Sequence, residues 1–220
     1  MSCGKVLEGL TGLAAVKQVL LIAGDVKEPQ GPFAATIEVM NTGLLGRYGI
    51  NSLSIAGHPE GHPAVAENEV RAAETAKAQL AQQLGIEITF VTQFLFESVP
   101  IIDWCQQLRA RGVSAMITIG LAGPAKLTTL LNFAYALRRR SLDSRHRHSR
   151  QCADQADRGT RSRADRPRAP RAYLSGELVI DGLHLYSFGG LLRTCRWFNA
   201  VADGSFELDD DGGFSLTSAN

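Results

Sequence analysis

Short apolar runs alternate along most of the chain with longer segments in which apolar residues recur at helical spacing. The runs are rich in aliphatic, β-branched and aromatic residues, as is typical of buried strands. They lie at residues 18–23, 50–56, 86–94, 114–120 and 178–186. The segments of helical spacing or composition lie at residues 34–45, 64–83, 98–111, 124–137 and 190–200. Because strands alternate with helices, the pattern predicts a parallel sheet covered by helices.

Polar residues stand at the carboxyl ends of three predicted strands, and these are Asp25, His58 and Gln93. In a (β/α) barrel the active site lies at that end of the strands. A closed barrel needs eight strands and about 250 residues, whereas this pattern gives five strands in 220 residues. We therefore predict an α/β fold, a partial (β/α) TIM-type barrel of five parallel strands, with these three side chains at one rim.

Residues 138–171 interrupt the alternation. They hold 12 of the chain's 18 arginines, no lysine, and one aliphatic residue larger than alanine, Leu142. Such a segment offers no face to bury, so we expect it to make no core contacts. It could be a basic arm for RNA or phosphate, a solvated linker, or a segment scrambled by a frame error. We favour the frame error, because GC-rich DNA read out of frame yields this composition. The regular pattern of strand and helix segments resumes at residue 173.

The interruption divides the chain into four parts. The predicted parts are the first portion of the barrel at residues 1–137, the arginine-rich insert at 138–172, the last βα unit at 173–203 and a tail at 204–220.

Composition and charge narrow the class of protein only slightly. The net charge is +1, so the overall balance indicates no partner. The four cysteines are scattered, without a CxxC pair, which favours a reducing, cytoplasmic setting. No apolar run reaches the roughly 18 residues of a membrane span, so we expect no membrane partner. Nucleic-acid binding through residues 138–171 is the rival, non-enzymatic hypothesis, and homo-oligomerisation stays open.

The segment GHPEGHP, residues 57–63, places His58 and His62 four residues apart. Zinc-binding pairs at this spacing normally lie on one helix face. Here a proline follows each histidine and disfavours helix at that position, so we predict an extended loop leaving a strand. No third ligand is in view, and we expect no metal site. A surface loop stiffened by proline and a loop that holds a cofactor are both open at this point.

Several short motifs occur in a fixed order, each where a predicted strand ends. They are LLIAGD (20–25), HPEGHP (58–63), VTQFLFE (91–97) and ITIGL (117–121), followed later by GLHLY (182–186). In this order they resemble the methylenetetrahydrofolate reductase family of flavin-dependent (β/α)₈ barrels. The family's motifs are R-G-D at one strand end, a Y-P-E-x-H-P-E-A loop, an I-T-Q-x-x-F strand and a last strand G-[IL]-H-F-Y. The resemblance covers residues 18–137 and 173–200.

This resemblance implies an oxidoreductase of one-carbon metabolism and methionine biosynthesis. It would transfer a hydride from NAD(P)H through FAD to 5,10-methylenetetrahydrofolate, giving 5-methyltetrahydrofolate. The resemblance implies that Asp25 is catalytic and that Asp25 and Gln93 bind the folate-type substrate. The positions implied to hold FAD are Ala23, Gly24, Asp25, His58, His62, Pro63, Ala64, Val65 and Lys77.

The two implied substrate-binding residues also have plainer interpretations. A carboxylate at a strand end, like that of Asp25, is desolvated enough to be tuned and could stabilise a cationic iminium form of the substrate. Without the resemblance, a helix cap is the simpler interpretation. Gln93 lies in an otherwise apolar strand, and its amide could pair with a pterin edge or a nicotinamide amide. The alternative is a core glutamine with its hydrogen bonds satisfied.

The chain departs from the family pattern in several places. Ala23 replaces the arginine and His58 replaces the usual tyrosine. The family's first three strands, including the glutamate that serves as its acid, have no counterpart in the segments of this sequence that match the family. The helical region before the last strand is replaced by the arginine-rich segment. We therefore expect this chain to be incomplete as a reductase and to show little turnover.

Overall fold

The structure is a computed structural model that describes residues 3–23, 29, 31–62, 65–95, 98–125, 180–208 and 214–217. In this part of the chain, five parallel strands form one sheet in chain order. They are β1 (Gln18–Leu21), β2 (Ser52–Gly57), β3 (Glu87–Phe94), β4 (Met116–Ala122) and β5 (Gly182–Tyr186). Each predicted strand is present, with ends shifted by a few residues. The predicted α/β fold is therefore confirmed.

Helices connect and flank the strands. The helices described are α1 (Cys3–Ala14), α2 (Thr36–Asn41), α3 (Leu44–Arg47), α4 (Glu67–Leu84), α5 (Ser98–Ala110) and α9 (Leu191–Ala202). The helix predicted at 34–45 is split in two at Gly43, and the helix predicted at 64–83 begins three residues later than expected. Gly85 ends α4 with φ 65, and its N–H donates to the Gln82 carbonyl, as is typical of a glycine that follows a helix.

Two elements were not predicted. They are α1 and a hairpin of β6 (Phe206–Leu208) and β7 (Phe214–Leu216). The arginine-rich residues 138–171 and the helix predicted at 124–137, beyond its first two residues, lie outside the described part of the chain.

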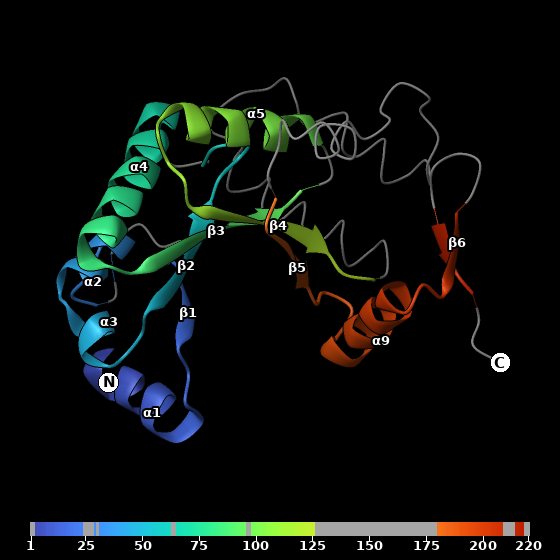
Figure 1. Cartoon of the computed structure of the whole chain (residues 1–220), viewed down its shortest axis with the longest axis horizontal. Helices are drawn as coiled ribbons and strands as arrows, with labels where there is room; N and C mark the ends of the chain where they lie inside the picture. The colour runs from blue at the N-terminus through green and yellow to red at the C-terminus, as the bar shows by residue number, and fades with distance from the viewer. Residues whose placement is uncertain are drawn as a thin grey trace.

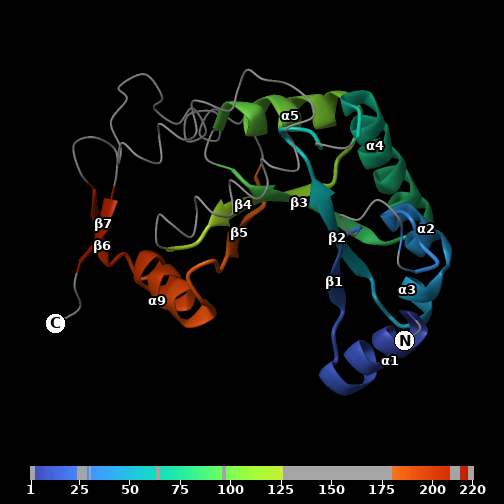
Figure 2. The ribbon, with the colours of Figure 1, turned by 180° about the vertical axis from the view of Figure 1, so that it is seen from behind.

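The sheet curls into a half-barrel with α2, α3, α4 and α5 on its convex side (Figures 1 and 2). The core lies between this side of the sheet and the helices. Its fully buried members are large and apolar, and they include Met40, Leu53, Ile55, Phe90, Trp104, Leu108 and Ile117. Side chains alternate along a strand, so the neighbouring positions of β2, β3 and β4 face the concave side.

Small and polar residues dominate the concave face. Ser54 and Ala56 alternate with the core residues of β2, and Thr118 and Gly120 pair in register with Gly182 and His184 of β5. Closed barrels fill this space with layers of bulky branched side chains. These positions therefore lack the bulky filling of a closed barrel, and they lead to the carboxyl edge where the site residues were predicted. None of the helices in the described residues is long and apolar enough to cross a membrane.

Candidate functional site

The carboxyl edge of the sheet brings together two of the three predicted rim residues. His58 follows the last residue of β2, and Gly57 pairs with Thr92 of β3, so His58 and Gln93 lie side by side at this edge. Ala23 follows β1 at the same edge and is exposed. Asp25 lies outside the described residues, as do Gly24, Pro63 and Ala64, and their positions stay predictions.

The segment from His58 to His62 leaves the strand as a loop, as the prolines predicted, but it forms a tight turn and is not extended. The Gly61 N–H donates to the His58 carbonyl at 2.9 Å, and His62 forms an isolated bridge with Val65. The rings of His58 and His62 meet edge to face with their centroids 5.6 Å apart. Helix α4 begins at Glu67, so the two histidines do not share a helix face.

A buried carboxylate anchors this loop to the helical layer. Glu74 on α4 is 1% exposed, and donors from three segments converge on it. The indole N–H of Trp104 on α5 donates to Oε1 at 3.0 Å, and Arg111, just after α5, donates to Oε2 at 2.9 Å. The backbone N–H of His58 donates to Oε1 at 3.3 Å. Because charge-assisted hydrogen bonds are strong in a dry setting, Glu74 fixes where the loop starts.

Arg71, one turn before Glu74 on α4, holds the next part of the loop. Its Nη1 donates to Glu74 at 3.2 Å and to the His58 carbonyl at 2.9 Å. Its Nη2 donates to the Pro59 carbonyl at 3.4 Å. One guanidinium therefore joins two consecutive loop carbonyls to the buried carboxylate.

Nothing in the sequence pattern predicted this network. Helix α4 consists largely of Ala, Glu, Gln and Lys, which is typical of a solvated helix. A buried charge at Glu74 depends on Trp104 and Arg111, which lie about thirty residues or more along the chain.

Two buried polar atoms beside the loop have no hydrogen-bond partner among the described residues, and these are His58 Nδ1 and Arg71 Nε. Burial, with smaller contributions from the charges of His62, Lys77 and Arg71, lowers the pKa of His58 from 6.5 to about 4. His58 is therefore a neutral imidazole near neutral pH. Since buried polar atoms are normally paired, these two are suited to a polar ligand at this edge.

Lys77 brings a second unmatched group to the same side of α4. Burial lowers the pKa of its ammonium, while Glu74 raises it. Across the residues that the structure describes, no carboxylate lies within ion-pair distance of Lys77. A partly buried ammonium whose only described counter-charge, Glu74, lies beyond ion-pair distance favours an anionic ligand group.

The start of α4 is poorly suited to binding an anion. Glu67 and Glu69 occupy its first turn. Their charges complement the positive end of the helix dipole and would repel a phosphate. Val65, implied to hold FAD, is exposed just before this turn. Anion binding at this loop therefore depends on side-chain cations.

A β-bulge in β3 presents Gln93. The pairing with β4 shifts by one residue between Val91 and Phe94. The buried Thr92 hydroxyl accepts from the Gly120 N–H and donates to the Gln93 carbonyl, both at 2.9 Å. The Tyr186 hydroxyl donates to the Thr92 carbonyl at 3.0 Å. Bulges re-aim side chains near binding sites, and Gln93 is left partly buried at the rim.

Aromatic rings border Gln93 on the β5 side. Phe94 packs edge to face against Phe188, with centroids 4.8 Å apart, and Tyr186 packs against His184 at 4.6 Å. The ring of Tyr186 covers Gly120, where a Cβ would lie 2.8 Å from it. This edge therefore presents an amide beside flat apolar rings.

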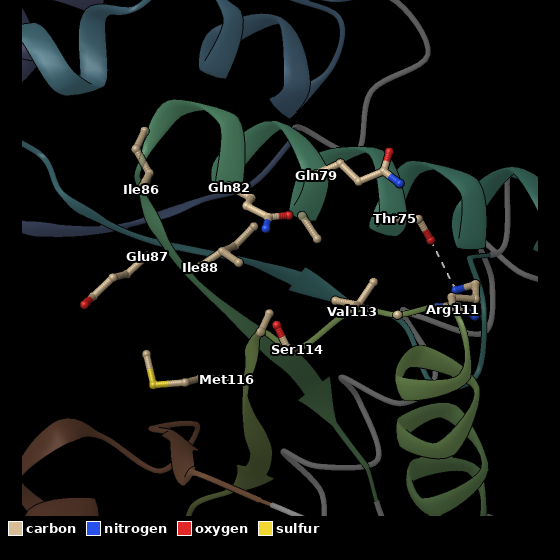
Figure 3. Close-up of a pocket in the computed structure, with 13 residues that line it drawn as sticks. Thr75, Gln79, Gln82, Ile86, Glu87, Ile88, Arg111, Val113, Ser114 and Met116 are labelled. Atoms are coloured by element: carbon tan, nitrogen blue, oxygen red, sulfur yellow. Dashed lines mark hydrogen bonds between the residues drawn. The ribbon is translucent and has the colours of Figure 1, made fainter.

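A separate groove of about 450 Å³ lies near the opposite, amino end of β3 and β4, beside α4 (Figure 3). Gln79, Gln82 and Ile88 line it, and Arg111 at its border donates to Thr75 at 3.2 Å. In barrel folds this end serves stability rather than catalysis, and the groove shares no residue with the predicted site.

The residues at the carboxyl edge fit a flavin dinucleotide better than a metal. The orphaned His58 Nδ1 can meet a polar ring or chain atom, and the Lys77 ammonium can meet a diphosphate. Within the described ranges, no group of three His, Cys, Asp or Glu side chains is placed to hold a metal ion. No known protein-family model matches the chain.

Proposed function

We propose that this chain is a methylenetetrahydrofolate reductase-like flavoprotein. The reaction would move a hydride from NAD(P)H by way of FAD to 5,10-methylenetetrahydrofolate, giving 5-methyltetrahydrofolate. When bound, FAD would supply the hydride-carrying chemistry, and the protein would supply binding, orientation and electrostatics. The loop from His58 to Val65, Lys77 and the segment Ala23–Asp25 would hold FAD, while Gln93 and Asp25 would bind the substrate.

One observation carries this proposal. The loop that resembles the family's flavin loop and the Gln93 that resembles its substrate-binding glutamine lie side by side at the carboxyl edge of a parallel half-barrel. The unpartnered His58 Nδ1 belongs to this loop, and the Lys77 ammonium is close enough to lower the pKa of His58. An unpartnered polar atom and a cation at that edge support a flavin site.

Gln93 has a role that its surroundings support. Its amide can donate and accept at the same time, and the bulge holds its backbone through Thr92. The neighbouring rings of Phe94 and Tyr186 suit a planar ligand. Asp25 would stabilise positive charge on the substrate during hydride transfer.

Flavin binding by the purified chain tests the proposal. We expect bound FAD to show as flavin absorption and as quenched fluorescence on titration. Lys77→Gln should weaken FAD binding by roughly 10-fold, because an ion pair to the diphosphate is lost. The exposed Lys17→Gln is the matched control and should bind as the unaltered chain does. Failure of the unaltered chain to bind FAD at micromolar concentrations would overturn the proposed function.

A further inference from the structure

We propose that Arg71 is a positioning residue, whose guanidinium clamps the His58–Pro59 backbone and presets the loop for its ligand. The inference deepens the proposed function, and its ligand-binding consequence rests on FAD being that ligand. Its structural consequence, a loop ordered before any ligand arrives, can be tested without FAD.

Two backbone hydrogen bonds are described within the loop. They run from the Gly61 N–H to the His58 carbonyl, at 2.9 Å, and from the Val65 N–H to the His62 carbonyl, at 3.4 Å. The first is a single turn, and the second is long for a hydrogen bond. The strand ladder ends at Gly57, and immediately beyond it side chains from α4 bond to the backbone of His58 and Pro59.

Arg71 supplies the larger share of those contacts. Its two terminal nitrogens reach the carbonyls of His58 and Pro59 while it also pairs with Glu74. Its side chain is 12% exposed. A planar, forked donor suits two adjacent carbonyls in a way that a lysine ammonium does not. Since Glu74 also accepts from the His58 N–H, the His58 residue is held at both its N–H and its carbonyl.

The clamp is itself anchored deep in the core. Glu74 is fixed by Trp104, which is 1% exposed and whose ring lies against Gly57. A Cβ at Gly57 would come within 2.8 Å of that ring. The strand end and the loop start therefore rest on the same indole. A loop ordered in advance loses less entropy on binding, which raises affinity without any new contact.

Arg111 provides a matched control within the same network. It pairs with Glu74 at 2.9 Å, as Arg71 does at 3.2 Å, and it is also partly buried. It donates to Thr75 but to no carbonyl of the loop. Removing either arginine takes one positive partner from Glu74, so both changes should lower stability, whereas only the change at Arg71 releases the loop.

The experiment compares Arg71→Gln with Arg111→Gln by hydrogen exchange of the ligand-free protein. We expect amide exchange at His58, Glu60, Gly61 and His62 to be at least 10-fold faster in Arg71→Gln, and within about 3-fold of the unaltered chain in Arg111→Gln. Should Arg71→Gln fail to fold, Arg71→Lys replaces it, because lysine keeps the charge but cannot hold both carbonyls. Equal acceleration in both variants, or none in the Arg71 variant, would overturn the inference.

FAD titration of the same variants tests the functional consequence. We expect at least 10-fold weaker FAD binding in Arg71→Gln or Arg71→Lys and near-unaltered binding in Arg111→Gln. Equal losses in both variants would show that the network is merely structural. If the unaltered chain binds no FAD, the proposed function fails, and hydrogen exchange alone then decides whether Arg71 orders the loop.

Discussion

At the scale of single residues, the surroundings of His58 strongly change the pKa of its imidazole. Burial lowers its pKa from 6.5 to about 4 in the folded protein. In the unfolded chain it takes up a proton near pH 6.5. Between pH 6.5 and 4 the unfolded state therefore binds more protons, and folding stability falls as the pH falls through that window.

We predict that replacing His58 removes part of this pH dependence. Between pH 7.5 and pH 5 the unaltered chain should lose about 1–2 kcal/mol more unfolding free energy than His58→Gln does, allowing for partial exposure of the ring. Urea denaturation of both proteins at the two pH values measures the difference. The prediction is wrong if the two proteins lose the same unfolding free energy between these pH values.

Gly57 is constrained by the indole that supports the loop. A Cβ at this position would lie 2.8 Å from two ring atoms of Trp104, itself buried in the core. We predict that Gly57→Ala lowers the free energy of unfolding by about 1–3 kcal/mol, as overpacking of a core does. Chemical denaturation measures the loss.

Gly46→Ala serves as the comparison for that change. Gly46 lies in α3, and nothing lies within 4 Å of a Cβ built there. Alanine should be neutral or stabilising by up to about 1 kcal/mol at such a helix position. Similar effects of the two substitutions would contradict the assigned role of Trp104.

At the scale of elements, the bulge in β3 depends on one hydroxyl. Thr92 is fully buried and bonds both to Gly120 of β4 and to the Gln93 carbonyl. We predict that Thr92→Val, which keeps the shape, costs about 1–3 kcal/mol because the Gly120 N–H is left unpaired. Thermal and urea unfolding report the loss.

Thr89→Val serves as the comparison. Thr89 is another buried position of β3, and its hydroxyl makes no hydrogen bond among the described residues, so this change should alter the free energy of unfolding by less than about 0.5 kcal/mol. A Thr92→Val protein as stable as the Thr89→Val protein would refute this role for the hydroxyl.

The elements themselves were largely predictable, whereas their irregular details were not. Aliphatic runs bounded by glycine and polar residues identified all five strands, and Gly85 correctly marked the end of α4. These signals are local, so one sequence carries them. The bulge at Thr92 requires knowing what pairs with β3, and the burial of Glu74 requires Trp104 from another helix. Such long-range partners leave no periodic trace in the sequence.

The site shows the same division. The prolines of GHPEGHP predicted a loop, and a loop is present. His58 and Gln93 lie at the carboxyl ends of their strands, where the pattern of strands had placed them. Arg71 and Arg111 were missed because charged residues on an alanine-rich helix or after it ordinarily face water. That such charged residues are buried can be recognised only once the packing of the helices is known.

At the scale of the whole molecule, the described sheet is open. In the residues that the structure describes, β1 and β5 are its edge strands, and the concave face carries exposed apolar side chains such as Leu20 and Met116. A barrel has no edges, whereas an open sheet leaves unpaired backbone groups and exposed apolar surface. The half-barrel can hold the loop and Gln93 in place without enclosing a ligand between them.

This openness leads to a prediction about activity. We expect the 220-residue chain, assayed alone, to show little or no reductase turnover even if it binds FAD. A half-barrel shields its ligand less from water than a closed barrel, which weakens the electrostatic stabilisation on which hydride transfer depends. The acid that the resemblance assigns to the family's first strand also has no counterpart among the matched motifs. General acid–base catalysis typically contributes about 10²- to 10⁴-fold, so losing it alone would be severe. The measurement is NADH- or NADPH-dependent reduction of 5,10-methylenetetrahydrofolate with added FAD, and Asp25→Asn is the control. Robust turnover that Asp25→Asn abolishes would contradict this expectation.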